Sequence, residues 1–205
     1  MTPAPKALLF DMDGTLTEPM LDFPLIRREM GIAADEPILE ALARLTPHQR
    51  NVAESILLRH EEAAAAGSVI APGCRQLLQW AGQNSIPTAL ITRNSRLSAT
   101  TVLQRHNIDL NVLICREDAP YKPDPAPLLL ACRKLSVAPH DAWMIGDGRH
   151  DIEAGCAAGI ATVWISLGRQ RNFAAQPWQT VSDLGELFQL LAASRPKPEP
   201  SCELF

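Results

Sequence analysis

Two aspartates, Asp11 and Asp13, directly follow a short apolar run from Ala7 to Phe10. Such a run is typical of a strand that is buried on both faces of a parallel sheet. Side chains alternate along a strand, so two carboxylates at its end, two residues apart, can point the same way. Neighbouring carboxylates repel each other unless a cation lies between them or they share a proton. Gly14 allows the backbone to approach a ligand, although Asp and Gly are also common at strand ends for conformational reasons alone.

A second pair of aspartates lies in the stretch that begins at Trp143. The apolar run there ends at Gly146, Asp147 follows at once, and Asp151 comes four residues later, where a helix is expected to begin. Helix capping would explain Asp151, but it does not explain Asp147. Carboxylate oxygens are hard ligands that suit Mg²⁺. The sequence therefore predicts a magnesium site formed by all four aspartates.

Two further segments offer hydrogen-bond donors and a positive charge. Thr92, Arg93 and Asn94 follow the apolar run Thr88–Ile91 and precede a predicted helix, whose N-terminus can hold an anion. Simple capping of that helix is an equally good interpretation. Lys122, one of only four lysines, stands before a proline that restricts it to extended backbone. Taken alone, this lysine is more typical of an exposed loop.

Together these segments supply carboxylates for a cation, hydroxyl and amide donors, and a fixed positive charge. Phosphoryl transfer needs a nucleophile, a cation that neutralises charge, and donors to the phosphoryl oxygens. The combination therefore predicts phosphoryl-transfer chemistry if the four segments meet in space.

The elements that must position these residues are short apolar runs alternating with helical segments. This alternation predicts an α/β fold with a Rossmann-like parallel sheet, in which ligands bind beyond the carboxyl ends of the strands. The expected strands are Ala7–Phe10, Thr88–Ile91, Val112–Cys115, Trp143–Ile145 and Ala161–Ile165. The expected helices of this core are Arg75–Asn84, Ser95–Asn107, Pro125–Leu135, Asp151–Ala158 and Asp183–Ala193.

The segment 17–70 breaks the alternation, because it contains no convincing strand. Two helices are expected in it, Pro37–Leu45 and Pro47–Gly67, which is more chain than one crossover between strands needs. The sequence therefore predicts a helical cap over residues 17–70 on an α/β core of residues 1–16 and 71–194. Residues 195–205 carry three prolines and are expected to form a flexible tail.

Composition excludes several classes of protein. The chain has 205 residues, is 46% hydrophobic and has a net charge of −4, so a generally basic, nucleic-acid-binding surface is not expected. No apolar stretch approaches the roughly 20 residues that span a bilayer, and the N-terminus lacks the apolar region of a secretory signal. Five cysteines without a C-x-x-C pair predict reduced thiols and a cytoplasmic location.

The order and spacing of these residues resemble the haloacid dehalogenase superfamily, in particular its phosphatases with a small helical cap. The stretch DMDGT that begins at Asp11 is similar to the first motif of that family. Thr92 falls where the second motif has a Ser or Thr, and Lys122 falls at the third. Asp147 and Asp151 match the fourth. The resemblance extends over residues 7–165, whereas the predicted cap carries little motif support.

The resemblance implies a role for each matching residue. Asp11 would be the nucleophile that forms an aspartyl-phosphate, and Asp13 would be the general acid and base. Mg²⁺ would be held by the side chains of Asp11, Asp147 and Asp151, the last directly or through water, and by the backbone carbonyl of Asp13. The residues expected to bind the phosphate are Thr92, Arg93, Asn94 and Lys122. Gly148 departs from the pattern, since many relatives have a serine there.

Single residues separate the activities of this superfamily. Haloacid dehalogenases lack an aspartate at the position of Asp13, and phosphonoacetaldehyde hydrolases need a cap lysine, which the segment 17–70 does not contain. Sugar phosphomutases use a histidine soon after the first motif, and the stretch from Met20 to Met30 has none. A phosphatase is therefore expected. The alternatives are a phosphomutase of the same family and a non-catalytic phosphate-binding or regulatory module.

The expected substrate is a small phosphorylated metabolite, such as phosphoglycolate or a sugar phosphate. Arginines of the predicted cap could bind a second anionic group, although each alone is more typical of a solvated helix face. The candidates for specificity are Arg27, Arg28, Arg44, His48, Arg50 and His60. The sequence does not determine the oligomeric state.

Overall fold

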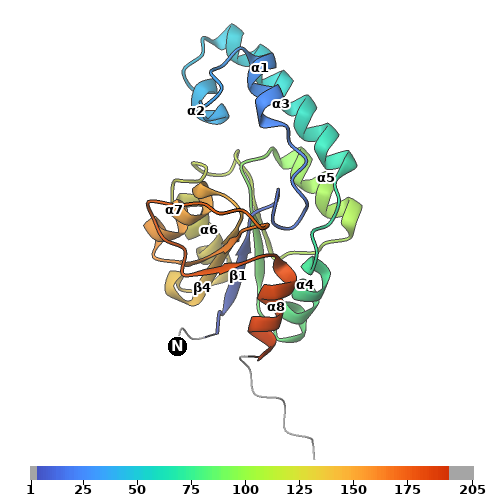
Figure 1. Cartoon of the computed structure of the whole chain (residues 1–205), viewed down its shortest axis with the longest axis vertical. Helices are drawn as coiled ribbons and strands as arrows, with labels where there is room; N and C mark the ends of the chain where they lie inside the picture. Colours follow the sequence, from blue (N-terminus) through green and yellow to red (C-terminus); the bar gives the residue numbers. More distant parts are fainter. Residues whose placement is uncertain (1–3, 194–205) are drawn as a thin grey trace, which may run out of the picture.

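A six-stranded parallel sheet forms the centre of the molecule (Figure 1), as seen in a computed structural model that describes residues 4–193. The strand order is β3-β2-β1-β4-β5-β6, and every neighbouring pair is parallel. The strands are β1 (Ala7–Phe10), β2 (Thr88–Ile91), β3 (Val112–Ile114), β4 (Ala142–Gly146), β5 (Ala161–Ile165) and β6 (Gln179–Val181). The predicted α/β fold with a parallel, Rossmann-like sheet is confirmed.

Helices cover both faces of this sheet, which explains why the central strands are apolar at every position. In β1, Leu8 and Phe10 pack with one cluster of buried side chains, and Ala7 and Leu9 pack with another. The first cluster includes residues of α4 (Cys74–Gln83), α5 (Arg96–His106) and α8 (Leu184–Ala193). The second includes residues of α6 (Ala126–Leu135) and α7 (Arg149–Ala158). A short 3₁₀ helix, Pro139–Asp141, leads into β4.

Three helices lie beyond the carboxyl ends of the strands, at the top of Figure 1. They are α1 (Phe23–Met30), α2 (Ile38–Leu42) and α3 (Pro47–Gly67). Their apolar side chains form a small cluster of their own, with Ile26 and Leu57 among its buried members. The chain leaves and re-enters the sheet region where Thr17 and Ile70 form an isolated β-bridge. We call this part of the chain, residues 17–70, the helical segment.

Two elements were not expected from the sequence. Helix α1 was missed although its caps are readable, since Asp22 accepts a hydrogen bond from the Leu25 backbone N–H at 2.9 Å and Gly31 ends the helix with φ 69°. Strand β6 was missed because it has three residues, lies at the sheet edge and is only partly buried. An edge strand has no reason to be apolar throughout.

The other boundaries agree with prediction to within a few residues. Helix α3 has the predicted bounds, Ser95 caps α5 by accepting from Ser98 N, and Gly159 ends α7 with φ 67°. The cysteines of the described part of the chain are free thiols. No helix within residues 4–193 is both long and apolar enough to cross a membrane. The predicted tail, residues 195–205, lies outside the described residues.

Candidate active site

A cavity of about 700 Å³ lies between the carboxyl ends of the strands and the helical segment. All eight residues that the sequence singled out for chemistry line it. They come from four separate strand ends or the loops after them: Asp11 and Asp13 after β1, Thr92, Arg93 and Asn94 after β2, Lys122 after β3, and Asp147 and Asp151 after β4. The sheet therefore brings together what the sequence separates by up to 140 positions.

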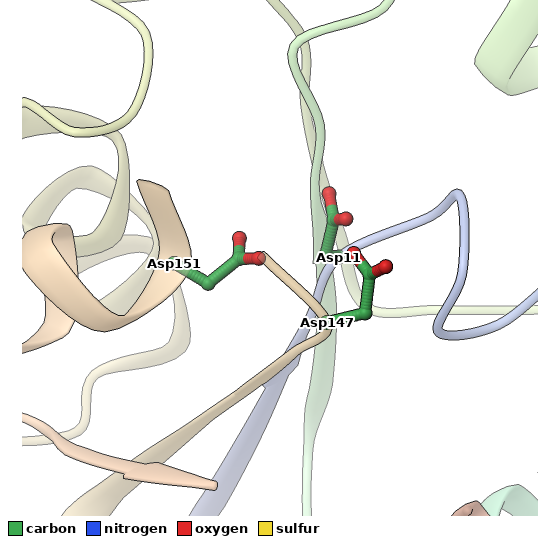
Figure 2. A group of neighbouring side chains, drawn as sticks. All are labelled: Asp11, Asp147 and Asp151. Atoms are coloured by element: carbon green, nitrogen blue, oxygen red, sulfur yellow. The ribbon is translucent and has the colours of Figure 1, made fainter. Parts of the chain in front are cut away.

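Three of the carboxylates form a compact cluster at the centre of the cavity. Asp11, Asp147 and Asp151 each offer an oxygen within 4.8 Å of the others. Figure 2 shows their carboxyl groups projecting towards one space from the ends of β1 and β4 and from α7. The register explains this, because β1 and β4 are neighbours and the Asp11 backbone N–H donates to the Ile145 carbonyl at 2.9 Å. Such a group of hard oxygen ligands could hold a divalent cation.

Two glycines make room for these carboxylates. Gly14 has φ +78°, and a Cβ there would lie 2.4 Å from Oδ2 of Asp147. A Cβ at Gly146 would lie 2.2 Å from the carboxyl carbon of Asp151. Any larger residue at either position would displace an aspartate of the cluster, so the glycines belong to the site as much as the acids do.

Lys122 is buried in the site, so the simpler interpretation of an exposed loop lysine is wrong. Its side chain is only 2% exposed. Its ammonium group donates to Asp11 Oδ1 at 2.7 Å, to Asp151 Oδ1 at 2.6 Å and to the Ile91 carbonyl at 2.6 Å. Burial by itself lowers the pKa of Lys122, but the two carboxylates outweigh it and raise the pKa above the ordinary value. The lysine is therefore a permanent positive charge at neutral pH.

Burial dominates the electrostatics of the acidic cluster in the absence of a cation. It raises the pKa of Asp11 to about 6, against the opposing effect of Lys122. It also raises the pKa of Asp151, and, together with the charge of Asp11, the pKa of Asp147. Buried carboxylates that are costly to ionise by themselves become favourable to ionise when a cation neutralises them.

Asp13 stands apart from the three-carboxylate cluster. Its Oδ2 accepts a hydrogen bond from the Asn94 side-chain amide at 2.7 Å. Burial and the negative charge of Asp11 raise the pKa of Asp13 to about 7, while the bond from Asn94 works in the opposite direction. A carboxyl group with this pKa exchanges its proton readily at neutral pH, which is what a general acid and base requires.

The segment after β2 supplies donors, and its arginine is already occupied. Thr92 is buried, and its hydroxyl oxygen accepts from the Asn94 backbone N–H at 3.1 Å. The Arg93 guanidinium makes a two-point ion pair with Glu40 of α2, at 2.8 and 3.0 Å. It also donates to the Lys122 carbonyl at 2.5 Å and lies 4.9 Å from the ring centre of Tyr121. Arg93 thus links the helical segment to the loops that carry the site.

Sequence reasoning missed several polar residues of the cavity. Glu61 of α3 is 2% exposed, accepts from the Ser95 backbone N–H at 3.2 Å and pairs with Arg116. Arg169, in the loop after β5, donates to Asp147 Oδ2 at 2.9 Å. No pattern marks either one, because Glu61 lies in an ordinary helix-forming stretch and the loop after β5 has no motif. Only tertiary structure brings them to the cavity.

Of the specificity candidates in the helical segment, Arg27 lines the cavity. Its Nε donates to the Glu36 carbonyl at 2.8 Å, and within residues 4–193 no acceptor binds its two terminal nitrogens. The other candidates lie elsewhere: Arg28 and His48 are exposed, Arg44 pairs with Glu36, Arg50 with Glu54, and His60 with Glu29. None of these five lines the cavity.

The comparison with known protein families identifies the architecture. A model of the haloacid dehalogenase-like hydrolases matches residues 26–165. The chain belongs to this family. A haloacid dehalogenase-like hydrolase domain-containing protein of Arabidopsis thaliana is 32% identical over 169 residues, which cover 77% of this chain and 69% of that protein. The resemblance inferred from the four motifs is confirmed.

Other members of the family share most of their length with this haloacid dehalogenase-like hydrolase. An N-acetylmuramic acid 6-phosphate phosphatase of Pseudomonas aeruginosa is 30% identical, over 80% of this chain and 82% of that protein. A phosphoglycolate phosphatase of Pseudomonas savastanoi pv. phaseolicola is 28% identical, over 89% and 78%. The crystal structure of a hydrolase from Pseudomonas syringae has the same fold, with a TM-score of 0.78, 21% identity, and 93% and 99% of the two chains covered.

Proposed function

We propose that this haloacid dehalogenase-like hydrolase is a magnesium-dependent phosphatase of a small phosphomonoester and that it acts through an aspartyl-phosphate. The observation that carries the proposal is the pairing of two different aspartates at the end of β1. Asp11 is bound to the charged Lys122, whereas Asp13 is bound to neutral Asn94 and has its pKa raised to about 7. Two carboxyl groups in such unlike surroundings suit a nucleophile and a proton donor.

In the first step, an oxygen of the Asp11 carboxylate attacks the phosphorus atom. A bond forms between that oxygen and phosphorus, and the bond from phosphorus to the ester oxygen breaks. The leaving alkoxide takes the proton of the Asp13 carboxyl group and departs as an alcohol. Lys122 holds Asp11 ionised and offsets negative charge on the phosphoryl group.

In the second step, the Asp13 carboxylate removes a proton from water. The water oxygen forms a bond to phosphorus, and the bond between phosphorus and the Asp11 oxygen breaks. Inorganic phosphate leaves, Asp11 returns to its carboxylate form, and Asp13 is protonated for the next cycle. Each group thereby ends where it began.

The cluster of Asp11, Asp147 and Asp151 fits Mg²⁺, because all three ligands are carboxylates and two glycines leave space for them. Bound there, the ion would neutralise charge on the phosphoryl oxygens and on the carboxylates. We also propose the Asp13 carbonyl as a ligand, as the family resemblance implies. Thr92 and Asn94 are proposed to donate to the phosphate. A phosphate contact by the Arg93 side chain would require its pair with Glu40 to open.

We further propose that the substrate carries a carboxylate as well as the phosphate. Two arginines of the cavity, Arg27 from α1 and Arg171 from the loop after β5, have no ion-pair partner within residues 4–193 and could bind such a group. The names of two relatives, an N-acetylmuramic acid 6-phosphate phosphatase and a phosphoglycolate phosphatase, also describe substrates that hold both groups. A cavity of about 700 Å³ suits a small metabolite.

We propose that the helical segment acts as a cap that covers this site, standing on a core of residues 1–16 and 71–194. The polar links Arg93–Glu40 and Arg116–Glu61 join the two parts around the cavity. A cytoplasmic location is also proposed, on the ground that the described cysteines are free thiols. No partner beyond the small-molecule substrate is proposed.

Hydrolysis of p-nitrophenyl phosphate tests the proposed activity. Turnover is expected with Mg²⁺ and should fall to background with EDTA, then return when excess Mg²⁺ is added. Absence of turnover on this and other phosphate esters would favour the non-catalytic alternative. A product that is an isomeric phosphate rather than inorganic phosphate would favour a phosphomutase.

A matched pair of substrates tests the second anion. Phosphoglycolate and 2-hydroxyethyl phosphate differ only in a carboxylate replaced by a hydroxymethyl group. The expected kcat/KM is higher for phosphoglycolate by about tenfold or more, and Arg27→Ala should remove most of that preference. Equal kcat/KM values of the wild type for the two compounds would reject a carboxylate-bearing substrate of this size. The phosphatase proposal would remain intact.

A further inference from the structure

One arginine contacts Asp147, the carboxylate of the acidic cluster that Lys122 does not bind. A terminal nitrogen of the Arg169 guanidinium donates to Asp147 Oδ2 at 2.9 Å and approaches the Asp147 carbonyl at 3.3 Å. The indole N–H of Trp164 donates to the same carbonyl at 3.0 Å. Both the side chain and the backbone of Asp147 are therefore fixed by residues of β5 and the loop that follows it.

The loop itself is shaped to aim this arginine. Leu167 and Gly168 both adopt left-handed backbone conformations, with φ 50° and 74°. They close a tight turn in which the Arg169 backbone N–H donates to the Ser166 carbonyl at 2.9 Å and its Nε to the same carbonyl at 3.0 Å. A non-glycine residue in this conformation is uncommon and is maintained only where the surroundings impose it. Arg169 is consequently held through its backbone and through its Nε before the terminal nitrogen reaches Asp147.

Asp147 is thereby left with one bound oxygen and one free oxygen. Oδ2 accepts from Arg169, whereas Oδ1 accepts no hydrogen bond within residues 4–193. Gly14 leaves room for this carboxylate, since a Cβ at that position would lie 2.4 Å from Oδ2 and 3.2 Å from Oδ1. Asp11 has a comparable arrangement, with Oδ1 bound by Lys122. Each of these two carboxylates is anchored by a cationic side chain.

We propose that Arg169 is a positioning residue for the cation site: it holds Asp147 through Oδ2 so that Oδ1 is presented to the cation. This inference rests on the proposed function, because it presumes that the cluster of Asp11, Asp147 and Asp151 binds Mg²⁺. In this proposal Arg169 acts through Asp147, which it binds directly. Outer residues that orient a metal ligand commonly change metal affinity by about 10- to 100-fold when they are removed.

The direction of the change in Mg²⁺ affinity distinguishes a positioning role of Arg169 from a simple effect of its charge. Arg169 is positive, so by Coulomb repulsion alone its removal would make Mg²⁺ bind more tightly. Positioning predicts the opposite, weaker binding. Arg149 is the matched control, since it lines the same cavity and pairs with Glu153 at 3.6 Å on the surface, without contacting Asp147. Its replacement removes the same charge and leaves the anchoring of Asp147 intact.

The experiment measures Mg²⁺ binding by calorimetry, without substrate, to the wild type, Arg169→Gln and Arg149→Ala at pH 7.5. We expect the Kd for Mg²⁺ to rise about tenfold or more in Arg169→Gln and to stay equal or fall in Arg149→Ala. The Mg²⁺ concentration that half-saturates p-nitrophenyl phosphate hydrolysis should rise in parallel, while kcat at saturating Mg²⁺ recovers. A purely structural role of Arg169 would not give that recovery.

Equal or tighter Mg²⁺ binding by Arg169→Gln would overturn the inference, as would an equal loss in Arg149→Ala. If Arg169→Gln does not fold, Arg169→Lys serves in its place, because it keeps the charge and loses the planar guanidinium. Weaker binding by that variant supports positioning, and unchanged binding contradicts it. If the wild type binds Mg²⁺ and hydrolyses phosphate esters, and Arg169→Gln binds Mg²⁺ equally well, only this inference is rejected. A wild type that does neither would reject the proposed function as well.

Discussion

The ion pairs compared between the strand-end site and the helical segment differ in how deeply they are buried. At the strand ends, Lys122 and Asp151 are almost fully buried and bind each other at 2.6 Å. On the helical segment, the typical pair is Arg50–Glu54, four residues apart on one helix, with side chains 51% and 40% exposed. Buried charges are costly unless every partner is in place, whereas exposed pairs contribute little.

This difference assigns separate tasks to the two regions. The site residues that directly follow β1, β2 and β4 are positioned by the register of these neighbouring strands. The ion pairs that join the helical segment to the site are Arg93–Glu40 and Arg116–Glu61. We therefore expect the strand ends to carry the chemistry and the helical segment to govern access and substrate choice. The following predictions test that contrast.

The largest expected effect is at Asp11, the proposed nucleophile. Asp11→Asn should lower kcat on p-nitrophenyl phosphate by about a thousandfold or more, because an amide cannot form the covalent intermediate. The melting temperature should not fall, since the raised pKa of Asp11 means that its charge is unfavourable in the metal-free fold. Retention of more than a few per cent of activity would show that Asp11 is not the nucleophile.

The next effect concerns stability and compares the two regions directly. Lys122→Met should lower the free energy of unfolding by about 3–5 kcal/mol, because it leaves Asp11 and Asp151 buried without their partner. Arg50→Ala, in the helical segment, should change it by less than about 0.5 kcal/mol. Urea unfolding at pH 7 without metal measures both. Similar losses in the two variants would contradict the contrast between the regions.

A pH dependence of metal binding should follow from the raised carboxylate pKa values. Asp11, with a pKa of about 6, is mostly protonated at pH 5 and mostly ionised at pH 7. Mg²⁺ binds the ionised form, so its Kd should fall by about tenfold from pH 5 to pH 7, and binding should release protons. Calorimetry in buffers of different ionisation enthalpy measures both quantities.

The free energy of unfolding of the metal-free protein should depend on the same carboxyl groups. It should fall as pH rises, whereas Mg²⁺ affinity increases. A carboxyl group whose pKa is raised on folding stabilises the fold below its unfolded value, 3.8 for Asp11, and loses that contribution as pH rises through about 6. The Mg²⁺-induced rise in melting temperature should therefore be larger at pH 7.5 than at pH 5. A shift that does not depend on pH would contradict the assignment of these carboxylates as ligands.

The smallest effect is expected at the contact between the regions. Glu61→Gln should lower the free energy of unfolding by about 1–2 kcal/mol, because it weakens a buried pair with Arg116. Glu54→Gln is the exposed control and should have almost no effect. The charge of Glu61 also raises the pKa of Asp13. The alkaline limb of the pH profile of kcat should therefore move to lower pH in Glu61→Gln and stay in place in Glu54→Gln.

Much of the fold was readable from local patterns. Apolar runs of strand length marked β1, β2, β4 and β5 because those strands are covered by helices on both faces. The strand β6 was not readable, since an edge strand of three residues, only one of them buried, carries no such signal. Helix α1 carried cap signals at Asp22 and Gly31, which the sequence reasoning overlooked.

The sequence by itself determined the chemical inventory: four aspartates, a scarce lysine, and a threonine and asparagine, placed at the ends of apolar runs or in the segments that follow them. Parallel strands bring their carboxyl ends to one edge, so order along the chain was enough to predict that these groups meet. Only the tertiary structure decided what surrounds them. Lys122 is buried and paired with two carboxylates only because residues distant in sequence surround it. The raised pKa of Asp13 depends on such neighbours as well.

The same reason explains why Glu61 and Arg169 were invisible in the sequence. Their types are ordinary for a helix and a loop, and their meaning comes from what they contact, Arg116 and Ser95 for one and Asp147 for the other. Electrostatic effects depend on distance and burial rather than on position along the chain. Residue types and spacing therefore specified the reactive groups, and the packing of the folded chain specified how each one is held and charged.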